Sequence, residues 1–371
     1  MNNRNKIAVL SGDGVGIEVM ECALKVLDAI GFEADYEYCD IGWELWKNEG
    51  DALPQRTLDK LKQCDCAIMS AITSKPQSEA EKELSDELKG RGLKYSSPIV
   101  RLRKELNLYL NLRPAKSIST KFSFNNKDID IAVFRENTEG LYCGIEYDNI
   151  NGKIADVIAE TYPFIRAYDA ETTSLSMRLI SSNASRRILH SAFEYARKNC
   201  KRCVTIADKP NILRATGGRF VEEARNISRE YPDIEMQEMN IDAICMMLVK
   251  APEKFQVIIA ENMFGDIISD ITSQLSGGMG FAYSANIGDN FALFEPVHGS
   301  APKYAGMNKV NPSAMILSGA FMLEWLGETE MSRRIFNAVM ETAEEGKIVT
   351  YDIGGTFSNL EMTEEIIRKL K

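Results

Sequence analysis

Residues 255–270 read FQVIIAENMFGDIISD, and they show how this part of the chain is expected to fold. The first six residues form an apolar run, which is typical of a buried strand. From Glu261 onward the spacing is that of a helix, with Asp266 and Asp270 on one face. The opposite, core-facing stripe is expected to consist of Ile267, Ile271 and Leu275.

The two aspartates form a candidate site for a metal ion. Carboxylates one helical turn apart repel each other unless a cation lies between them. Only oxygen ligands are near, and neither of the two histidines is close in sequence, which favours Mg²⁺ or Mn²⁺. A solvated acidic helix face has the same spacing. Other parts of the chain must therefore decide between the two interpretations.

The alternation of apolar runs and amphipathic helices begins at the N-terminus. Residues 7–10 and 67–71 read as strands, and residues 18–30 read as a helix. Residues 312–326 are continuously apolar and predict a buried helix, whereas residues 79–94 are highly charged and predict a surface helix or loop. This order of elements predicts an α/β protein with a largely parallel sheet.

Composition excludes several classes of protein. A chain of 371 residues can form two domains that share a cleft, and its net charge of −10 argues against a general affinity for nucleic acid or anionic membranes. No apolar segment approaches the roughly 18 residues of a membrane span. The first apolar run is too short for a signal peptide, and the eight cysteines have no framework spacing. We therefore expect a cytoplasmic protein with reduced thiols.

Three arginines in the middle of the chain each follow an apolar run: Arg103, Arg113 and Arg135. Ser97 at the N-cap and Pro98 at the first helical position predict a helix that carries Arg103. Planar guanidinium groups that converge from separate elements suit a ligand with several carboxylates. Each arginine taken alone is more often a surface ion-pair partner.

Three further residues are candidates for chemistry. Lys209 follows the buried run 204–207, where nearby carboxylates could tune its pKa for proton transfer. Tyr142 lies seven residues beyond Arg135 in the same block. His298 lies in a glycine-punctuated loop whose backbone N–H groups could hold phosphate. For Tyr142 and Lys209, packing and capping are the alternative roles.

Together these motifs resemble the isocitrate/isopropylmalate dehydrogenase family, the metal-dependent β-decarboxylating dehydrogenases. The matching blocks follow one another in the family's order over essentially the whole chain: residues 12–16, 102–114, 135–142, 208–211, 262–270, 298–303 and 311–312. The resemblance implies two α/β domains around a central cleft. Residues 1–108 and 277–371 would form the large, cofactor-side domain with a mostly parallel sheet, and residues 109–276 the small domain with the dimer interface. The glycine turn 12–16 is then structural.

The resemblance also implies roles for the candidate residues. The substrate would be a 2-hydroxy acid with a carboxylate on C3, bound by Ser97, Ile99, Arg103, Arg113 and Arg135. The metal ligands would be Asp242, Asp266 and Asp270. Lys209 would accept the hydroxyl proton, and Tyr142 would protonate the enol carbon after loss of CO₂. Lys209 and Asp242 would come from the neighbouring subunit of a homodimer or a dimer of dimers.

The implied cofactor is NADP or NAD, bound by Thr73, His298, Gly299, Ser300, Ala301, Lys303, Tyr304, Asn311 and Tyr351. Lys303 stands where NAD-dependent members commonly have an aspartate, and a cation there would attract the 2′-phosphate of NADP. Tyr351 also matches the NADP enzymes, whereas Gly355 replaces the arginine that they carry. The sequence favours NADP over NAD.

The substrate is predicted from the turn before Arg103. Ser97 resembles the serine that contacts the γ-carboxylate in isocitrate enzymes, and residues 96–100 also resemble homoisocitrate enzymes. Ile99 and Val100 are apolar, as in isopropylmalate enzymes. With NADP as the deciding feature, we expect the conversion of isocitrate to 2-oxoglutarate, and 3-isopropylmalate or homoisocitrate as alternatives. A non-catalytic regulatory paralogue would usually lack one of the catalytic residues, and all are present here.

Overall fold

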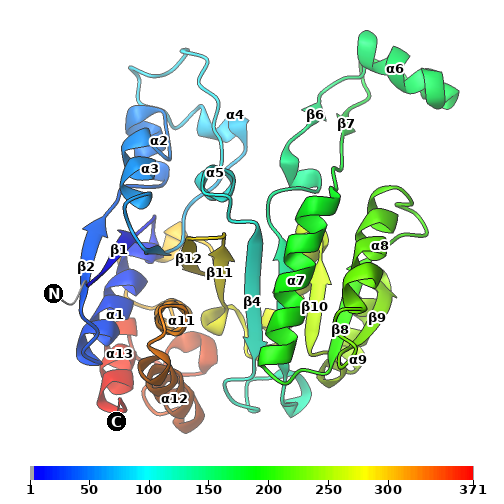
Figure 1. Ribbon diagram of the computed structural model, residues 1–371. Helices are drawn as coiled ribbons and strands as arrows, with labels where there is room; N and C mark the ends of the chain where they lie inside the picture. The colour runs from blue at the N-terminus through cyan, green and yellow to red at the C-terminus, as the bar shows by residue number, and fades with distance from the viewer. Residues whose placement is uncertain (1–3, 371) are drawn as a thin grey trace.

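A ten-stranded sheet runs through the part of the chain that the computed structural model describes, residues 4–370 (Figure 1). In order across the sheet, the strands are β2 (Ala34–Tyr38), β1 (Asn5–Leu10), β3 (Cys66–Met69), β12 (Ala292–Pro296), β11 (Tyr283–Ile287), β4 (Leu110–Lys116), β5 (Asp130–Glu136), β10 (Val257–Ala260), β8 (Cys203–Asp208) and β9 (Glu235–Asn240). Neighbouring strands are parallel toward both edges, and the antiparallel pairs lie in the middle, on either side of β11 and between β4 and β5. The predicted α/β fold with a mostly parallel sheet is confirmed.

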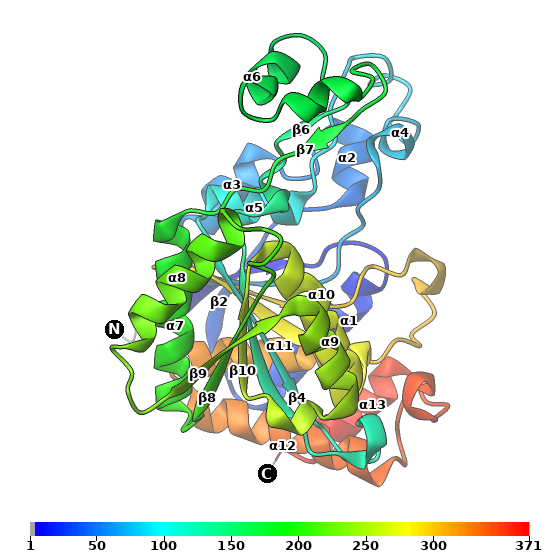
Figure 2. The same ribbon diagram turned by 90° about the vertical axis from the view of Figure 1, so that its right-hand side faces the viewer.

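Helices cover both faces of this sheet, as Figures 1 and 2 show. They are α1 (Val15–Ala29), α2 (Trp43–Glu49), α3 (Gln55–Leu61), α4 (Gln77–Ala80), α5 (Pro98–Glu105), α6 (Lys153–Thr161), α7 (Ser182–Lys198), α8 (Thr216–Ser228), α9 (Ile241–Lys250), α10 (Asn262–Ser276), α11 (Ser313–Trp325), α12 (Thr329–Glu345) and α13 (Asn359–Arg368). On one half of the sheet, α1, α11, α12 and α13 share a single apolar cluster with the strands. On the other half, α7 and α8 cover one face, and α9 and α10 cover the opposite face.

The first strand contributes to the core on both faces. Ile7 and Val9 pack with α1 and α11, whereas Ala8 and Leu10 pack with α3 and with Leu102 of α5. All four strand residues are at most 1% exposed. Burial on both faces explains why the strand reads as a continuous apolar run rather than an alternating one.

The predicted apolar stripe of α10 is wrong at one position. Ile267 is 47% exposed, while Ile268 is fully buried. The helix packs against β5 at Gly265, where an added Cβ would lie 2.7 Å from the Cβ of Arg135. This close contact fixes the rotation of α10, so that Ile268 faces the core and Asp266 faces Arg135.

Residues 140–179 leave the sheet and form an extension that we call the arm (Figures 1 and 2). It contains β6 (Glu146–Tyr147) and β7 (Leu175–Ser176), which pair antiparallel, and α6; Gly140 and Leu179 pair at its base. Large apolar side chains exposed on the arm include Tyr147, Val157, Tyr162, Phe164, Tyr168, Met177 and Leu179. Apolar surface gathered in this way is typical of a protein contact.

The charged residues 79–94 form mostly turns and irregular backbone after α4. Their apolar members attach them to α2: Leu84 is buried in one cluster with Trp46, whose indole N–H donates to the carbonyl of Ala80 at 2.8 Å. Tyr95 closes the segment with its ring 5.2 Å from the Trp46 ring. The segment is therefore a surface loop that packs against α2. This agrees with the surface helix or loop that the sequence predicts.

The domain boundaries stay a prediction. Strand β11 belongs to the expected large domain and β4 to the expected small domain, and the two pair directly within one sheet. Among residues 4–370, no helix is long and apolar enough to cross a membrane.

Candidate active site

The three predicted arginines converge from three elements: Arg103 from α5, Arg113 from within β4 and Arg135 from the end of β5. All are buried, with 7%, 8% and 1% of their surface exposed. Burial, together with the positive charges of Arg103 and Arg113, lowers the pKa of Arg135 to about 9. Three guanidinium groups in one buried place form an environment that favours an anionic ligand.

Asp266 lies at the centre of this group. One of its oxygens pairs with Arg135 and lies 3.3 Å from Nη1 of Arg113. The other accepts a hydrogen bond of 2.8 Å from the hydroxyl of Tyr142. Burial disfavours the ionised form of Asp266, but these partners outweigh it and hold its pKa below the usual value. Asp266 is therefore an anion at neutral pH.

Asp270 lies one turn further along α10 and is more open, with 60% of its side chain exposed. Nη1 of Arg113 donates to it at 3.2 Å. Partial burial and the negative charge of Asp266 raise the pKa of Asp270. The positive charge of Arg113 reduces this rise. The structure thus brings the predicted carboxylate pair and the arginines into one site.

A buried asparagine that the sequence did not single out holds this site together. The side-chain oxygen of Asn286 accepts hydrogen bonds from Asn111 at 3.0 Å, from Asn137 at 2.9 Å and from Nε of Arg103 at 3.0 Å. Its amide donates to Glu295 at 2.6 Å. Asn286 is fully buried, so these bonds are sheltered from water.

The other two arginines are also held by amide oxygens. Asn111 accepts from Nε of Arg113 at 2.7 Å, and Asn262 accepts from Arg135 at 3.0 and 2.8 Å. Asn111 precedes Arg113 by two residues, so both side chains lie on the same face of β4. That spacing is a local signal that could have identified Asn111 from the sequence.

A cavity of about 210 Å³ lies beside the arginines. Its lining includes Ser97, Ile99, Arg103 and Arg113 of the predicted substrate site, together with His298. Burial lowers the pKa of His298, whose Nε2 is buried without a hydrogen-bond partner in this structure. An unpaired ring nitrogen at the edge of the cavity is a polar group that a bound ligand can satisfy.

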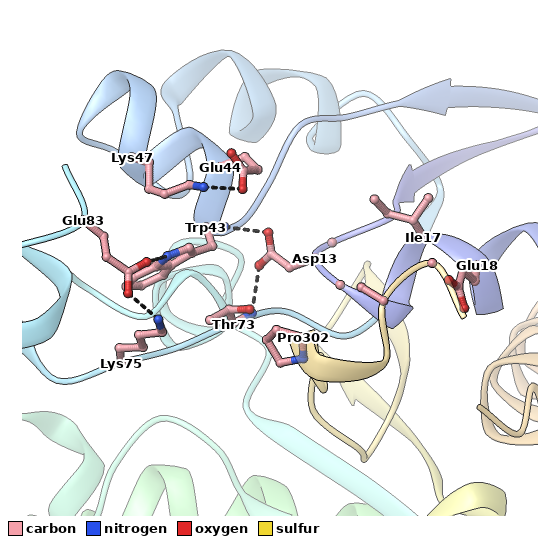
Figure 3. A pocket seen from close by; sticks show the side chains of 14 residues that line it. Asp13, Ile17, Glu18, Trp43, Glu44, Lys47, Thr73, Lys75, Glu83 and Pro302 are labelled. Atoms are coloured by element: carbon pink, nitrogen blue, oxygen red, sulfur yellow. Dashed lines mark hydrogen bonds and ion pairs between the residues drawn. The ribbon is translucent and has the colours of Figure 1, made fainter. Parts of the chain in front are cut away.

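A second cavity, of about 600 Å³, adjoins the predicted cofactor residues (Figure 3). The carboxylate of Asp13 accepts from the backbone N–H groups of Trp43 at 2.7 Å and Thr73 at 2.8 Å. The hydroxyls of Thr73 and Ser300 lie 2.7 Å apart. An added Cβ at Gly14 would lie 2.3 Å from the carbonyl oxygen of Ser300. The glycine turn therefore packs against the His298 loop and is part of the wall.

The remaining predicted cofactor residues lie on the same loop and on the segment after α12. The rings of Tyr304 and Tyr351 have centroids 6.1 Å apart, and Nζ of Lys303 lies 5.0 Å from the Tyr304 centroid. Asn311 is buried and donates to Asp352 at 3.0 Å, so its amide is already engaged. Lys303, Tyr304 and Tyr351 are accordingly the members of this set that are open to a ligand.

Lys209 and Asp242 lie together but apart from the other metal-site candidates. Nζ of Lys209 is 3.2 Å from Oδ1 of Asp242, and the two side chains are 33% and 65% exposed. Within residues 4–370 of one chain, no group of three acidic, histidine or cysteine side chains could hold a metal ion. The expectation that Asp242 joins Asp266 and Asp270 from a neighbouring subunit stays a prediction.

Comparison with known proteins identifies the family. The family model for isocitrate/isopropylmalate dehydrogenase matches residues 6–370. The chain belongs to this family. A crystal structure of isocitrate dehydrogenase from Methylococcus capsulatus is 36% identical in sequence, with a TM-score of 0.86 over 99% of each chain. The family and the fold that the sequence predicts are thus confirmed, and the chain is related to decarboxylating dehydrogenases throughout its length.

Curated relatives have different names at similar identity. Protein DlpA of Legionella pneumophila subsp. pneumophila is 42% identical over 98% of this chain, which spans 58% of that protein's length. Homoisocitrate dehydrogenase of Methanocaldococcus jannaschii is 39% identical, and 3-isopropylmalate dehydrogenase of Methanothermobacter thermautotrophicus is 38% identical, each over 99% of this chain and 98% of the relative. The comparisons therefore identify the family but not the substrate.

Proposed function

We propose that this protein catalyses the oxidative decarboxylation of a 2-hydroxy-3-carboxy acid, with isocitrate as the preferred substrate and 2-oxoglutarate as the product. The observation that carries this proposal is the convergence of three buried arginines beside a cavity, where Arg113 and Arg135 pair with the aspartates of α10 and Arg103 lies 3.7 Å from Glu295. Guanidinium groups bind carboxylates in pairs of hydrogen bonds, and such a group of them suits a substrate with several carboxylates.

Charge balance supports a substrate that binds together with a divalent ion. The three arginines carry three positive charges, and Asp266, Asp270 and Glu295 carry three negative charges when they are ionised. A divalent ion adds two positive charges, which two or more substrate carboxylates would neutralise. Arg113 and Arg135, which pair with Asp266 in the free protein, would then be available for those carboxylates.

The donor set fits Mg²⁺ or Mn²⁺. Asp266 and Asp270 offer only oxygen ligands, one helical turn apart, and Asp242 of a neighbouring subunit would complete the set. When bound, the ion supplies Lewis acidity that makes the substrate hydroxyl more acidic and stabilises negative charge on its oxygen.

Lys209 and Tyr142 divide the proton transfers between them. Lys209, assisted by Asp242, would accept the hydroxyl proton, and NAD(P), when bound, would supply the nicotinamide that takes up the hydride of C2, so that the substrate becomes a 2-oxo acid. After CO₂ leaves C3, Tyr142 donates its proton to that carbon. Burial and the adjacent Asp266 raise the pKa of Tyr142, so the phenol keeps its proton at neutral pH, as this role requires.

The cofactor preference that we propose is NADP over NAD, by a modest margin. Lys303 offers a cation to the 2′-phosphate, beside the rings of Tyr304 and Tyr351. The arginine of typical NADP enzymes has no room here, because a Cβ on Gly355 would lie 1.8 Å from the carbonyl oxygen of Val349. With one cation instead of two, discrimination against NAD is reduced.

A second candidate substrate is 3-isopropylmalate. Ile99 lines the cavity one turn before Arg103 and offers an apolar surface for an alkyl group. Ser97 lines the same cavity and suits the γ-carboxylate of isocitrate instead. Homoisocitrate, with one further methylene group, is the remaining alternative.

Turnover measurements test this proposal. The purified protein is assayed with isocitrate, homoisocitrate and 3-isopropylmalate, each with NADP and NAD, in Mg²⁺ and in excess chelator. We expect the highest kcat/KM for isocitrate with NADP and no turnover in chelator. The variant Asp266→Asn should lose most activity with its fold intact, whereas Asp289→Asn, an exposed aspartate outside the cavity, should not. Full activity in chelator would contradict the metal site, and a higher kcat/KM for 3-isopropylmalate would reverse the order of substrates.

A further inference from the structure

Arg178 forms a buried ion pair to which the proposed function gives no role. It lies at the base of the arm, just after β7, with 9% of its side chain exposed. Nη2 donates to Oδ2 of Asp208 at 2.8 Å, and Nη1 lies 3.5 Å from Oδ1 of the same carboxylate. Nη1 also donates to the hydroxyl of Thr216 at 2.9 Å. The side chain of Asp208 is 0% exposed, so Arg178 neutralises a carboxylate that has no contact with water.

Asp208 connects this ion pair to the predicted catalytic lysine. The backbone N–H of Lys209 donates to Oδ1 of Asp208 at 2.7 Å. The first turn of α8 also packs on this carboxylate, because an added Cβ at Gly217 would lie 2.5 Å from Oδ1. Asp208 therefore fixes the direction in which the chain leaves β8, and with it the position of Lys209.

The second acidic neighbour of Arg178 makes a weaker contact. Oε2 of Glu261 lies 3.7 Å from Nε of Arg178, and neither atom has a hydrogen-bond partner in this structure. The other oxygen of Glu261 caps α10 by accepting from the backbone N–H of Phe264 at 3.0 Å. Arg178 is thus hydrogen-bonded toward Asp208, whereas Glu261 is attracted only by charge.

We propose that Arg178 is a positioning residue that holds Lys209 in place for proton transfer in the site of the neighbouring subunit. This inference rests on the proposed function, in which Lys209 completes that site. Removal of the guanidinium leaves the buried carboxylate of Asp208 without a counter-charge. The carboxylate must then take up a proton or rotate toward water, and the N–H of Lys209 loses its fixed acceptor.

Kinetics of homodimers give the first test. Arg178→Gln keeps polar contacts but removes the charge, and it should lower kcat by about tenfold or more while it changes the substrate KM by less than about threefold. Arg178→Lys keeps a cation for Asp208 and should recover most of kcat. Arg225→Gln is the matched control, because Arg225 forms an exposed pair with Glu238 at 2.6 Å; its kcat should stay within about twofold. A raised KM at unchanged kcat, or no recovery with lysine, would overturn the proposal.

Hybrid dimers show on which site Arg178 acts. A dimer of one Lys209→Met subunit and one Tyr142→Phe subunit has a single intact site, built from the first subunit's Tyr142 and the second subunit's Lys209. We add Arg178→Gln to either subunit in turn. The loss of kcat should be larger when it is on the subunit that donates Lys209. An equal or larger loss on the other subunit would mean that Arg178 acts through Glu261 and α10, and would overturn the proposal.

Two further outcomes are covered by these experiments. If the parent hybrid shows no activity after confirmed subunit exchange, the shared site of the proposed function is contradicted, and the homodimer kinetics alone then decide on Arg178. If Arg178→Gln does not fold, Thr216→Val takes its place, because it removes one hydrogen bond of the guanidinium and leaves the charge. This substitution should lower kcat by about two- to fivefold, and the loss should again be larger when it is on the subunit that donates Lys209. An unchanged kcat would overturn the proposal.

Discussion

At the scale of single residues, Asn286 shows how much of this site depends on neutral groups. One amide oxygen accepts from Arg103, Asn111 and Asn137, and the amide nitrogen donates to Glu295. An aspartate in place of Asn286 would also accept hydrogen bonds from these three donors. It could donate a hydrogen bond to Glu295 only after its carboxylate took up a proton.

The variant Asn286→Asp should therefore be destabilised at neutral pH by about 1–3 kcal/mol, measured by urea unfolding. The introduced carboxyl would be fully buried and would face Glu295, and together these two effects raise its pKa in the folded state above that in the unfolded state, while the cation of Arg103 reduces the rise. The folded state then binds more protons, and the variant should approach wild-type stability as the pH falls toward 5. An Asn290→Asp control, at an exposed position in the turn between β11 and β12, should track the wild type at every pH. A stability difference that does not depend on pH would contradict the donor role of Asn286.

A second prediction at this scale concerns the cofactor. Lys303→Asp should lower kcat/KM for NADP by about ten- to a hundredfold, because a charge-assisted contact is replaced by repulsion of the 2′-phosphate. The kcat/KM for NAD should stay unchanged or rise, since a carboxylate can accept hydrogen bonds from the free ribose hydroxyls of NAD. Lys309→Asp, an exposed lysine six residues further on, is the control. A wild type that prefers NAD, unchanged by Lys303→Asp, would refute the NADP preference.

At the scale of elements, the contact between α10 and β5 places the carboxylates against the arginines. At Gly265 there is no room for a side chain, because an added Cβ would lie 2.7 and 2.8 Å from the Cβ and Cγ of Arg135. Gly265→Ala should push α10 away from β5, destabilise the protein by about 1–3 kcal/mol and raise the metal concentration needed for half-maximal activity.

Gly218 in α8 is the matched control for this prediction. An added Cβ there meets nothing within 4 Å, so Gly218→Ala should stabilise its helix by up to about 1 kcal/mol without changing metal dependence. Equal effects of the two substitutions, measured by thermal unfolding and metal titration, would show that the close packing at Gly265 does not position the carboxylates.

The same helix shows what the sequence could predict and what it could not. The strand-to-helix transition, the pair Asp266 and Asp270, and the three arginines follow from local patterns and family motifs, and the structure brings these residues together. The burial of Ile268 instead of Ile267 depends on a contact with another strand, which no local pattern encodes. Asn286 was missed for the same reason, because three of its four partners, Arg103, Asn111 and Asn137, come from distant parts of the chain.

At the scale of the whole molecule, a single chain is incomplete as a proposed enzyme. Lys209 and Asp242 form an exposed pair separate from Asp266 and Asp270, and the arm presents large apolar side chains to solvent. Both features are explained if a second copy covers the arm and receives Lys209 and Asp242 into its site. Arg178 connects these two features, because it joins the base of the arm to Asp208, the residue before Lys209.

The last prediction tests this assembly. Val157 and Phe164 on the arm are 65% and 63% exposed. If a second copy buries them, Val157→Asp combined with Phe164→Asp should shift the protein from dimer to monomer in size-exclusion chromatography with light scattering. The cost of burying two charges in an apolar contact exceeds what the remaining surface can offset. Activity should fall with dissociation and return in part at high protein concentration.

Tyr38 on β2 provides the control, because it is 62% exposed and lies outside the arm. Tyr38→Asp should leave both the dimer and its activity unchanged, which excludes a general effect of added charge. Circular dichroism should show that the arm variant keeps its secondary structure, since Val157 and Phe164 make no contribution to the apolar clusters of the sheet. A monomeric arm variant with full activity at every concentration would show that one chain holds a complete site, and the roles of Lys209 and Asp242 would then have to be sought within the same subunit.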